Sequence, residues 1–395
     1  MENNPLNHVR VIDFSTLLPG PYASMLLVNM GADVVKVESP TRPDLIKSLP
    51  PIINGQSAAD QQLNRGKRSI ALDLKSEGGL NAARRLAAHA DVVLEQFRPG
   101  VMDRLGLGFG ALKQLNKSLV YCSISGYGQT GPWSQRAGHD INYVSISGAA
   151  SYSGREGQGP QPSGMQWADL AGGSHHAVMG ILAALFAARE TGEGRHVDIS
   201  MTDAMFALNG LAGAAALATG CDPAPESEML NGGSFYDHYQ CACGGYLALG
   251  GLEPQFVETL AIKLDDSDLL GLKALHDGKT QGQLKSRLRE RFASKSRDHW
   301  LRTFGDADVC VTPVLTINQA ANHEQLVARE MVILANGETP AQLGDPIKFV
   351  GSRKSASRDP APRLGQHTRE LLNDIGFAER EISEMAKTGV VHCSE

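Results

Sequence analysis

The fold is decided by residues 10–38, which read RVIDFSTLLPGPYASMLLVNMGADVVKVE. Arg10 to Phe14 has the pattern of a short buried strand, and Asp33 to Glu38 predicts a second strand. Between them, Pro21 suits the first position of a helix that we expect to end near Met30. A strand, a helix and a strand in this order form a βαβ unit, which implies that the two strands are parallel.

The same alternation continues along the chain. Further strands are expected at Ser69–Leu74, Asp91–Gln96 and Leu119–Ile124, and helices at Lys75–Ala90 and Leu105–Asn116. Later elements are a long apolar helix, a strand and a helix of small residues, expected at Trp167–Arg189, Arg195–Met201 and Thr202–Ala218. Strands that alternate with helices from Arg10 to Ile124 indicate a Rossmann-like, mainly parallel α/β sheet.

The composition and the hydrophobic pattern of the sequence change after residue 218. A polar segment rich in Pro and Gly is followed by a pattern that predicts a hairpin of Phe235–Cys241 with Tyr246–Leu249, and then by charged helices. We therefore divide the chain into a large domain, a linker, a smaller α+β domain and a C-terminal segment: residues 1–218, 219–233, 234–325 and 326–395.

Composition narrows the classes of partner. The chain has 395 residues and a net charge of −6, so bulk electrostatics do not favour a nucleic acid or an anionic membrane. The apolar run Ala177–Ala188 is too short to span a bilayer, and the N-terminus lacks the pattern of a signal peptide. Six scattered cysteines suit reduced thiols, so we expect a cytoplasmic protein.

One cluster of potential metal ligands was considered. His238, Cys241 and Cys243 resemble half of a zinc site, but no second half follows at finger or ribbon spacing. No metal is therefore expected.

A glycine-rich stretch, residues 126–143, follows the expected strand Leu119–Ile124 and reads GYGQTGPWSQRAGHDINY. Such a loop, leaving a buried strand, is where an α/β protein places a ligand. His139 is its side chain best suited to move a proton near neutral pH, although a lone loop histidine is more often structural. The Gly-x-Gly-x-x-Gly pattern of residues 126–131 is a weak dinucleotide signal, because no helix start follows it.

Two carboxylates each have a structural and a chemical interpretation. Asp169, in QWADLAGG at residues 166–173, heads the long apolar helix. It would either cap that helix or act as a base in a partly desolvated site. Glu253, in GGLEPQF at residues 250–256, would either precede a helix opened by Pro254 or accept the second N–H of a histidine.

Several motifs follow one another in a single order: VIDF (11–14), LPGP (18–21), GADVVKVE (31–38), NRGKRS (64–69), LDLK (72–75), FRPGV (97–101), GYGQTGP (126–132), GHDINY (138–143) and ADLAGG (168–173). Joined in this order, and nearly end to end, the chain resembles the class III CoA-transferase family, and within it the α-methylacyl-CoA racemase branch.

The resemblance implies two chemistries for Asp169. In the racemases an aspartate pairs with a histidine, and a glutamate supports that histidine; these positions match His139, Asp169 and Glu253. This implies epimerisation of a 2-methylacyl-CoA by 1,1-proton transfer through an enolate, with backbone N–H groups at the start of the Asp169 helix as donors. The alternative is a CoA-transferase with Asp169 as nucleophile. A CoA-binding protein without activity is a third interpretation.

The resemblance also implies contacts to CoA from Leu72, Asp73, Leu74, Lys75, Gln96, Phe97, Arg98, Arg104, Gly138, Asp140 and Tyr143. Among these the three cations suit phosphates, or are simply solvated surface. Many relatives carry Arg directly after the acid that matches Glu38; here it is Ser39, with Arg42 three residues later. No tightly bound cofactor is expected, since CoA enters as part of the substrate.

The quaternary structure implied by the resemblance is an interlocked, ring-like homodimer of a Rossmann-like large domain and a smaller domain. Glu253 would then reach His139 from the neighbouring subunit. The segment Pro362 to Thr368 is similar to a family tail that returns to the large domain.

Overall fold

The computed structural model describes residues 4–337, 339–350 and 359–394. It forms two compact units. Unit 1 comprises Met1–Ser147, Gly164–Leu208 and His323–Glu395, and unit 2 comprises Gly148–Ser163 and Asn209–Asn322. Residues 148–163 and 209–218, which the sequence-based ranges place in the large domain, belong to unit 2. The ranges of the domains themselves stay a prediction.

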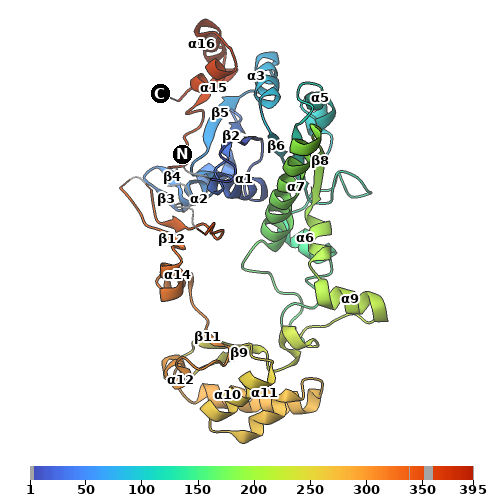
Figure 1. Ribbon diagram of the computed structural model, residues 1–395, viewed down its shortest axis with the longest axis vertical. Helices are drawn as coiled ribbons and strands as arrows, with labels where there is room; N and C mark the ends of the chain where they lie inside the picture. Colours follow the sequence, from blue (N-terminus) through green and yellow to red (C-terminus); the bar gives the residue numbers. More distant parts are fainter. Residues whose placement is uncertain (1–3, 338, 351–358, 395) are drawn as a thin grey trace. The chain divides into compact units, whose positions relative to one another are not determined.

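Unit 1 is built on a seven-stranded sheet with the order β14-β5-β2-β1-β6-β7-β8. Figure 1 labels β2, β5, β6 and β8 of this sheet. Its strands are β1 (Arg10–Asp13), β2 (Asp33–Glu38), β5 (Arg68–Leu72), β6 (Val92–Glu95), β7 (Val120–Ser125), β8 (His196–Ser200) and β14 (Val391–His392). All pairs are parallel except β14 with β5. Counted in chain order, the parallel strands lie in the Rossmann order 3-2-1-4-5-6, which confirms the predicted parallel α/β sheet.

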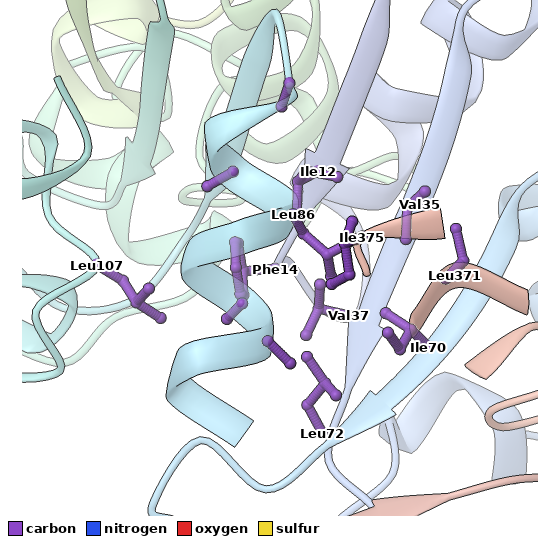
Figure 2. Packing of buried hydrophobic residues seen from close by; sticks show 14 of the residues in the cluster. Ile12, Phe14, Val35, Val37, Ile70, Leu72, Leu86, Leu107, Leu371 and Ile375 are labelled. Carbon is purple, nitrogen blue, oxygen red and sulfur yellow. The ribbon is translucent and has the colours of Figure 1, made fainter. Parts of the chain in front are cut away.

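Helices cover both faces of this sheet, so its parallel strands are buried on both sides. One face packs against α3 (Glu77–Ala88), α5 (Phe109–Lys113), α15 (Thr368–Asp374) and α16 (Glu379–Lys387). In Figure 2, Leu86 of α3 lies over Ile12 and Val37 of the sheet, and Leu371 of α15 joins the same cluster. The other face contacts α1 (Pro19–Asn29) and α7 (His176–Thr191).

The C-terminal segment completes the sheet of unit 1. The backbone N–H of His367 donates to the carbonyl of Ser69 at 2.9 Å, and the N–H of Ala71 donates to Thr368 Oγ1 at 3.0 Å. Strand β14 then pairs antiparallel with β5, so residues near 392 cover the edge that β5 would otherwise expose.

Shorter elements of unit 1 are η1 (Leu45–Ser48), β3 (Ile52–Ile53), β4 (Gln56–Ser57), α2 (Ala58–Asn64), α4 (Val101–Arg104), α6 (Asp140–Ile146), η2 (Ala168–His175), α8 (Met201–Ala207), α14 (Glu324–Ala328), β12 (Val332–Ile333) and β13 (Gln342–Leu343).

Two expected helices are wrong in detail. The helix expected at Leu105–Asn116 is absent as one element, because Gly106 has a φ of +66° and separates α4 from α5. The helix expected at Thr202–Ala218 is divided into α8 and α9 (Gly210–Thr219), where Gly210 has a φ of +42°. In each case a glycine in a left-handed conformation interrupts the expected helix.

The long apolar helix starts with η2, a π-helical stretch, and continues without interruption into α7. The combined helix, Ala168–Thr191, has 24 residues and is long and apolar enough to cross a bilayer by length and composition. The apolar run Ala177–Ala188, which was expected to be too short to span a bilayer, is therefore only part of a longer apolar helix. Core helices of globular proteins pass the same test, and 44% of the most apolar part of this helix is buried inside the protein.

Unit 2 contains the three-stranded antiparallel sheet β11-β10-β9. Pairing of β9 (Asp237–Gln240) with β10 (Tyr246–Leu249) confirms the predicted hairpin, and β11 (Val311–Pro313) adds a third strand. Phe292 centres the core, with ring centroids 5.3 Å from Tyr239 and 5.5 Å from Trp300. The helices of unit 2 are α9, η3 (Met229–Gly233), α10 (Pro254–Lys263), η4 (Ser267–Lys273), α11 (Gly278–Ala293), α12 (Arg297–Phe304) and α13 (Ile317–Ala321).

We predict that Leu86→Ala lowers the free energy of unfolding of unit 1 by about 2–5 kcal/mol, because it leaves a cavity between α3 and the sheet. Leu86 is 2% exposed. Leu115→Ala is the control, since Leu115 is 53% exposed. Urea unfolding followed by circular dichroism measures both, and equal losses in the two variants would contradict this packing.

Candidate active site

A cavity of about 350 Å³ lies in unit 1 at the carboxyl ends of β1, β6 and β7. Its walls come from Leu17–Pro19 after β1, Gln96–Pro99 after β6, and Ser125–Gly126 at the end of β7. Strand order reverses between β1 and β6, and in parallel sheets such a reversal opens a crevice where ligands bind. The topology of the sheet therefore selects this position.

His139 lies on the rim of the cavity, directly before α6. Its side chain is exposed. Its backbone is fixed on both sides by Asn142, whose Oδ1 accepts the N–H of His139 at 3.0 Å and whose N–H donates to the His139 carbonyl at 2.8 Å. The helix start thus orients the residue and leaves its imidazole available.

Asp169 lines the same cavity from the first turn of η2. Burial, with a smaller contribution from the charge of Asp140, raises the pKa of the Asp169 carboxyl to about 7. Among the described residues, none donates a hydrogen bond to this carboxylate. A half-desolvated carboxyl that titrates near neutrality can both take and return a proton.

The capping role considered for Asp169 belongs to Asp140 instead. Asp140 Oδ1 accepts the backbone N–H groups of Ala168 at 2.7 Å and Asp169 at 3.1 Å. The N–H of Leu170 donates to the carbonyl of Gln166 at 2.9 Å. The expectation that N–H groups at this helix start stabilise an enolate is therefore wrong, because these donors are already occupied.

Two glycines allow the close packing around the cavity. A Cβ on Gly173 would lie 3.2 Å from Pro19 Cβ, so glycine lets η2 approach the β1 loop. A Cβ on Gly126 would lie 2.4 Å from Tyr143 Cε1. Gly126 thus makes room for Tyr143, and the next helix begins only at Asp140.

The cavity brings together part of the predicted CoA set. With His139 and Asp169 it is lined by Gln96, Phe97, Arg98, Gly138 and Tyr143. Asp140 acts beside it as a cap. Leu72 lies in the core, and Leu74 packs against it. Asp73 accepts the N–H of Lys75 at 3.0 Å, while Lys75 and Arg104 are exposed. Since β5 lies three strand positions from β6, Leu72–Lys75 lie about 14 Å along the edge of the sheet.

Sequence reasoning missed Arg136 and the Leu17–Pro19 wall, both of which line the cavity. The Arg136 guanidinium lies 3.9 Å from the centre of the Trp133 ring, a cation–π contact that fixes the cation at the rim. A signal existed for Arg136, since it is a lone cation three residues before His139. No pattern in the sequence predicts that the turn after β1 lines the cavity.

Glu253 is in unit 2, between β10 and α10, and is not among the residues that line this cavity. Its side chain is exposed, and its backbone carbonyl accepts the N–H of Phe256 at 3.0 Å at the helix start. His238, Cys241 and Cys243 are also in unit 2. No cluster of three or more His, Cys, Asp or Glu side chains that could hold a metal occurs within residues 4–337, 339–350 and 359–394.

We predict that Asp169→Asn stabilises the folded protein increasingly as pH rises from 4 to 7. A carboxyl with a raised pKa in the folded state binds its proton more tightly there than in the unfolded chain. Its contribution to stability therefore falls between the unfolded pKa and about 7, and the asparagine escapes that loss. We expect a gain of about 1–3 kcal/mol at pH 8 and little at pH 4.

Urea unfolding at the two pH values measures this gain. Asp306→Asn, which removes an exposed carboxyl in unit 2, is the control and should show no such trend. A difference between Asp169→Asn and the unaltered protein that does not change with pH would refute the desolvation of Asp169.

Comparison with known proteins agrees with this fold. Residues 6–368 match the model of CoA-transferase family III. The alpha-methylacyl-CoA racemase of Mus musculus is 35% identical over 390 residues, covering 98% of this chain and 97% of that protein. The acetyl-CoA:oxalate CoA-transferase of Acetobacter aceti is 32% identical, covering 95% and 97%. The crystal structure of a CAIB/BAIF family protein from Brucella suis superposes with a TM-score of 0.82 at 29% identity, covering 95% of this chain and 100% of that one. The chain belongs to CoA-transferase family III.

Proposed function

We propose that the protein is an acyl-CoA racemase that epimerises 2-methylacyl-CoA thioesters by 1,1-proton transfer. The observation that carries this proposal is that His139 and Asp169 line one cavity, and that the Asp169 carboxyl has a pKa of about 7. Relatives of both kinds, racemases and transferases, lie at similar identity to this chain. The choice between them therefore rests on the site.

In this reaction one group removes the α-proton and the other returns a proton to the opposite face. The electrons of the C–H bond move onto the thioester carbonyl, which becomes an enolate, and they form the new C–H bond when the second group donates. Asp169 and His139 exchange protonation states in each turnover. The carboxyl of Asp169 suits this exchange because both of its forms are populated near pH 7.

The enolate oxygen needs donors other than those at the start of η2. Helix α6 begins directly after His139, and the N–H groups of Asp140 and Ile141 in its first turn make no hydrogen bond within the described part of the chain. These two donors directly follow His139 in the sequence. We assign the enolate oxygen to this helix start.

The CoA portion follows the edge of the sheet from the cavity. Arg98 and Arg136 supply positive charge at the cavity, and Lys75 and Arg104 supply exposed charge farther out. The hydroxyl of Ser39 accepts the N–H of Arg42 at 3.2 Å, so the turn after β2 presents Arg42 in place of the usual arginine after Glu38. CoA is part of the substrate, and no resident cofactor enters the reaction.

The proposal includes an interlocked homodimer in the cytoplasm, in which Glu253 of one subunit orients His139 of the other. Glu253 is exposed, as a residue that contacts a partner must be before assembly. The role proposed for Glu253 is supported by the surroundings of His139, which has no carboxylate partner among the described residues of its own chain.

A CoA-transferase is the second candidate. The Asp169 carboxylate is free of hydrogen bonds from the described residues, so it is sterically and electronically available to attack a thioester. Its raised pKa weakens this candidate, because less of the carboxyl is ionised at neutral pH than in an ordinary aspartate.

We predict that one epimer of a 2-methylacyl-CoA, incubated with the protein in D₂O without free acid, exchanges its α-hydrogen and loses stereochemical purity. His139→Ala and Asp169→Asn should each reduce the rate at least about 100-fold, the usual contribution of a general acid–base group. NMR and chiral chromatography follow the two signals. Absence of exchange over a panel of acyl chains, together with Asp169-dependent transfer of CoA to added carboxylates, would establish the transferase instead.

The shared site is tested by subunit complementation. If Glu253 acts in trans, co-expressed His139→Ala and Glu253→Ala chains form heterodimers with one intact site, because the intact His139 and the intact Glu253 then meet. We expect each heterodimer to recover about half of the normal activity, while either homodimer stays inactive. Heterodimers purified with two affinity tags and found inactive would show that Glu253 does not act across subunits.

A further inference from the structure

The turn that connects β1 to α1 lies beside the cavity. Leu17, Leu18 and Pro19 form one apolar wall of the cavity that holds Asp169. Two neighbours hold the far end of this turn. The N–H of Gly20 donates to Gln96 Oε1 at 3.0 Å, and the Ser174 hydroxyl donates to the carbonyl of Pro19 at 2.6 Å.

Leu17 adopts a backbone conformation that leucine rarely takes. Its φ is +60°, in the left-handed region where a Cβ crowds the following carbonyl. A residue in such a conformation stays there only when surrounding contacts over-determine it, and such residues concentrate at functional sites. The contact that holds Leu17 is therefore informative.

That contact is the carboxylate of Asp44. The N–H of Leu17 donates to both oxygens of Asp44, at 3.1 and 3.2 Å. Asp44 comes from the long segment after β2 and also caps η1, accepting the N–H of Ile46 at 3.1 Å. One side chain thus joins the wall of the cavity to the segment that begins with Ser39 and Arg42.

Lys36 keeps this carboxylate in place. Its Nζ lies 2.9 Å from Asp44 Oδ2 and donates to the carbonyl of Ser15 at 3.1 Å, so it binds both ends of the tether. The side chains of Lys36 and Asp44 are 0% and 1% exposed. Burial alone would raise the pKa of Asp44, but the charge of Lys36 and three hydrogen bonds outweigh it and lower that pKa. The pair is ionised.

A buried ion pair is a poor way to stabilise a protein, because removing two charges from water costs about as much as their attraction returns. Hydrophobic side chains would fill the same space more simply. The Lys36–Asp44 pair lies next to Leu17, the strained residue of the cavity wall, so it can hold the backbone of that residue in place.

We propose that Asp44, held by Lys36, is a positioning residue that fixes the Leu17–Pro19 wall against the acyl group of the substrate. It touches neither substrate nor reacting atoms and acts through the backbone of Leu17. The inference rests on the proposed function only in taking an acyl group as the occupant of the cavity.

The test compares Asp44→Ala with Asp60→Asn in the full-length protein. Asp60 is a buried carboxyl of the same region, bonded to Asn64 at 2.7 Å, but it does not contact the Leu17–Pro19 wall. Amide hydrogen exchange of the peptide spanning residues 15–22 reports the tether directly. Calorimetric titration with CoA and with a 2-methylacyl-CoA reports its effect on the substrate.

We expect Asp44→Ala to speed exchange at Leu17, to weaken acyl-CoA binding about tenfold and to change CoA binding by less than about twofold. Asp60→Asn should do none of these. If Asp44→Ala fails to fold, Asp44→Asn replaces it, with a smaller change in the same direction.

Unchanged exchange at Leu17 overturns the inference whatever the protein catalyses. So does an equal loss of CoA and acyl-CoA affinity. The proposed function fails separately, when the unaltered protein neither prefers the acyl-CoA over CoA nor exchanges its α-hydrogen, and the hydrogen-exchange result still decides whether Asp44 holds the turn.

Discussion

Where strand order reverses between β1 and β6, the segments that leave their carboxyl ends turn away in opposite directions, and the space between them cannot be filled by either. This constraint positions the cavity, and the chemistry is added by segments that converge on it. Gln96 bridges the reversal by accepting the N–H of Gly20, so the two sides are held at a fixed separation. Asp169 enters from η2, which Gly173 allows to approach the turn after β1.

The charges of the site are arranged in two ways. Asp140 is used up in capping η2, whereas Asp169, the next acidic residue toward the cavity, is left without donors among the described residues. Capping by Asp140 stabilises the fold, whereas the Asp169 carboxyl lowers stability because it is partly desolvated. Reactive groups are commonly held in this unfavourable state by rigid surroundings. Here the surroundings are a π-helical turn and a sheet edge.

The sequence was sufficient for features that depend on local periodicity. Alternating strands and helices from Arg10 to Ile124 specified the parallel sheet, since buried parallel strands read as continuous apolar runs. It failed where one glycine decides the outcome, as at Gly106 and Gly210, because a helical pattern does not reveal φ. His139 and Asp169 were predicted through resemblance and chemistry, and both line the cavity. The capping role of Asp140 was not predicted. Its partner Ala168 is 28 residues away in the sequence, and only the folded structure brings the Asp140 carboxylate to that N–H group.

The pairing of β14 with β5 has a consequence for synthesis on the ribosome. Residues 68–72 are synthesised about 320 residues before the strand that covers their edge, which lies at residues 391–392. While the intervening residues are being translated, the nascent sheet therefore carries an uncovered edge, open to pairing with other chains. The protein is thus expected to depend on chaperones during its synthesis more than its finished structure suggests, and truncations near residue 390 should aggregate even though every residue of the cavity is present.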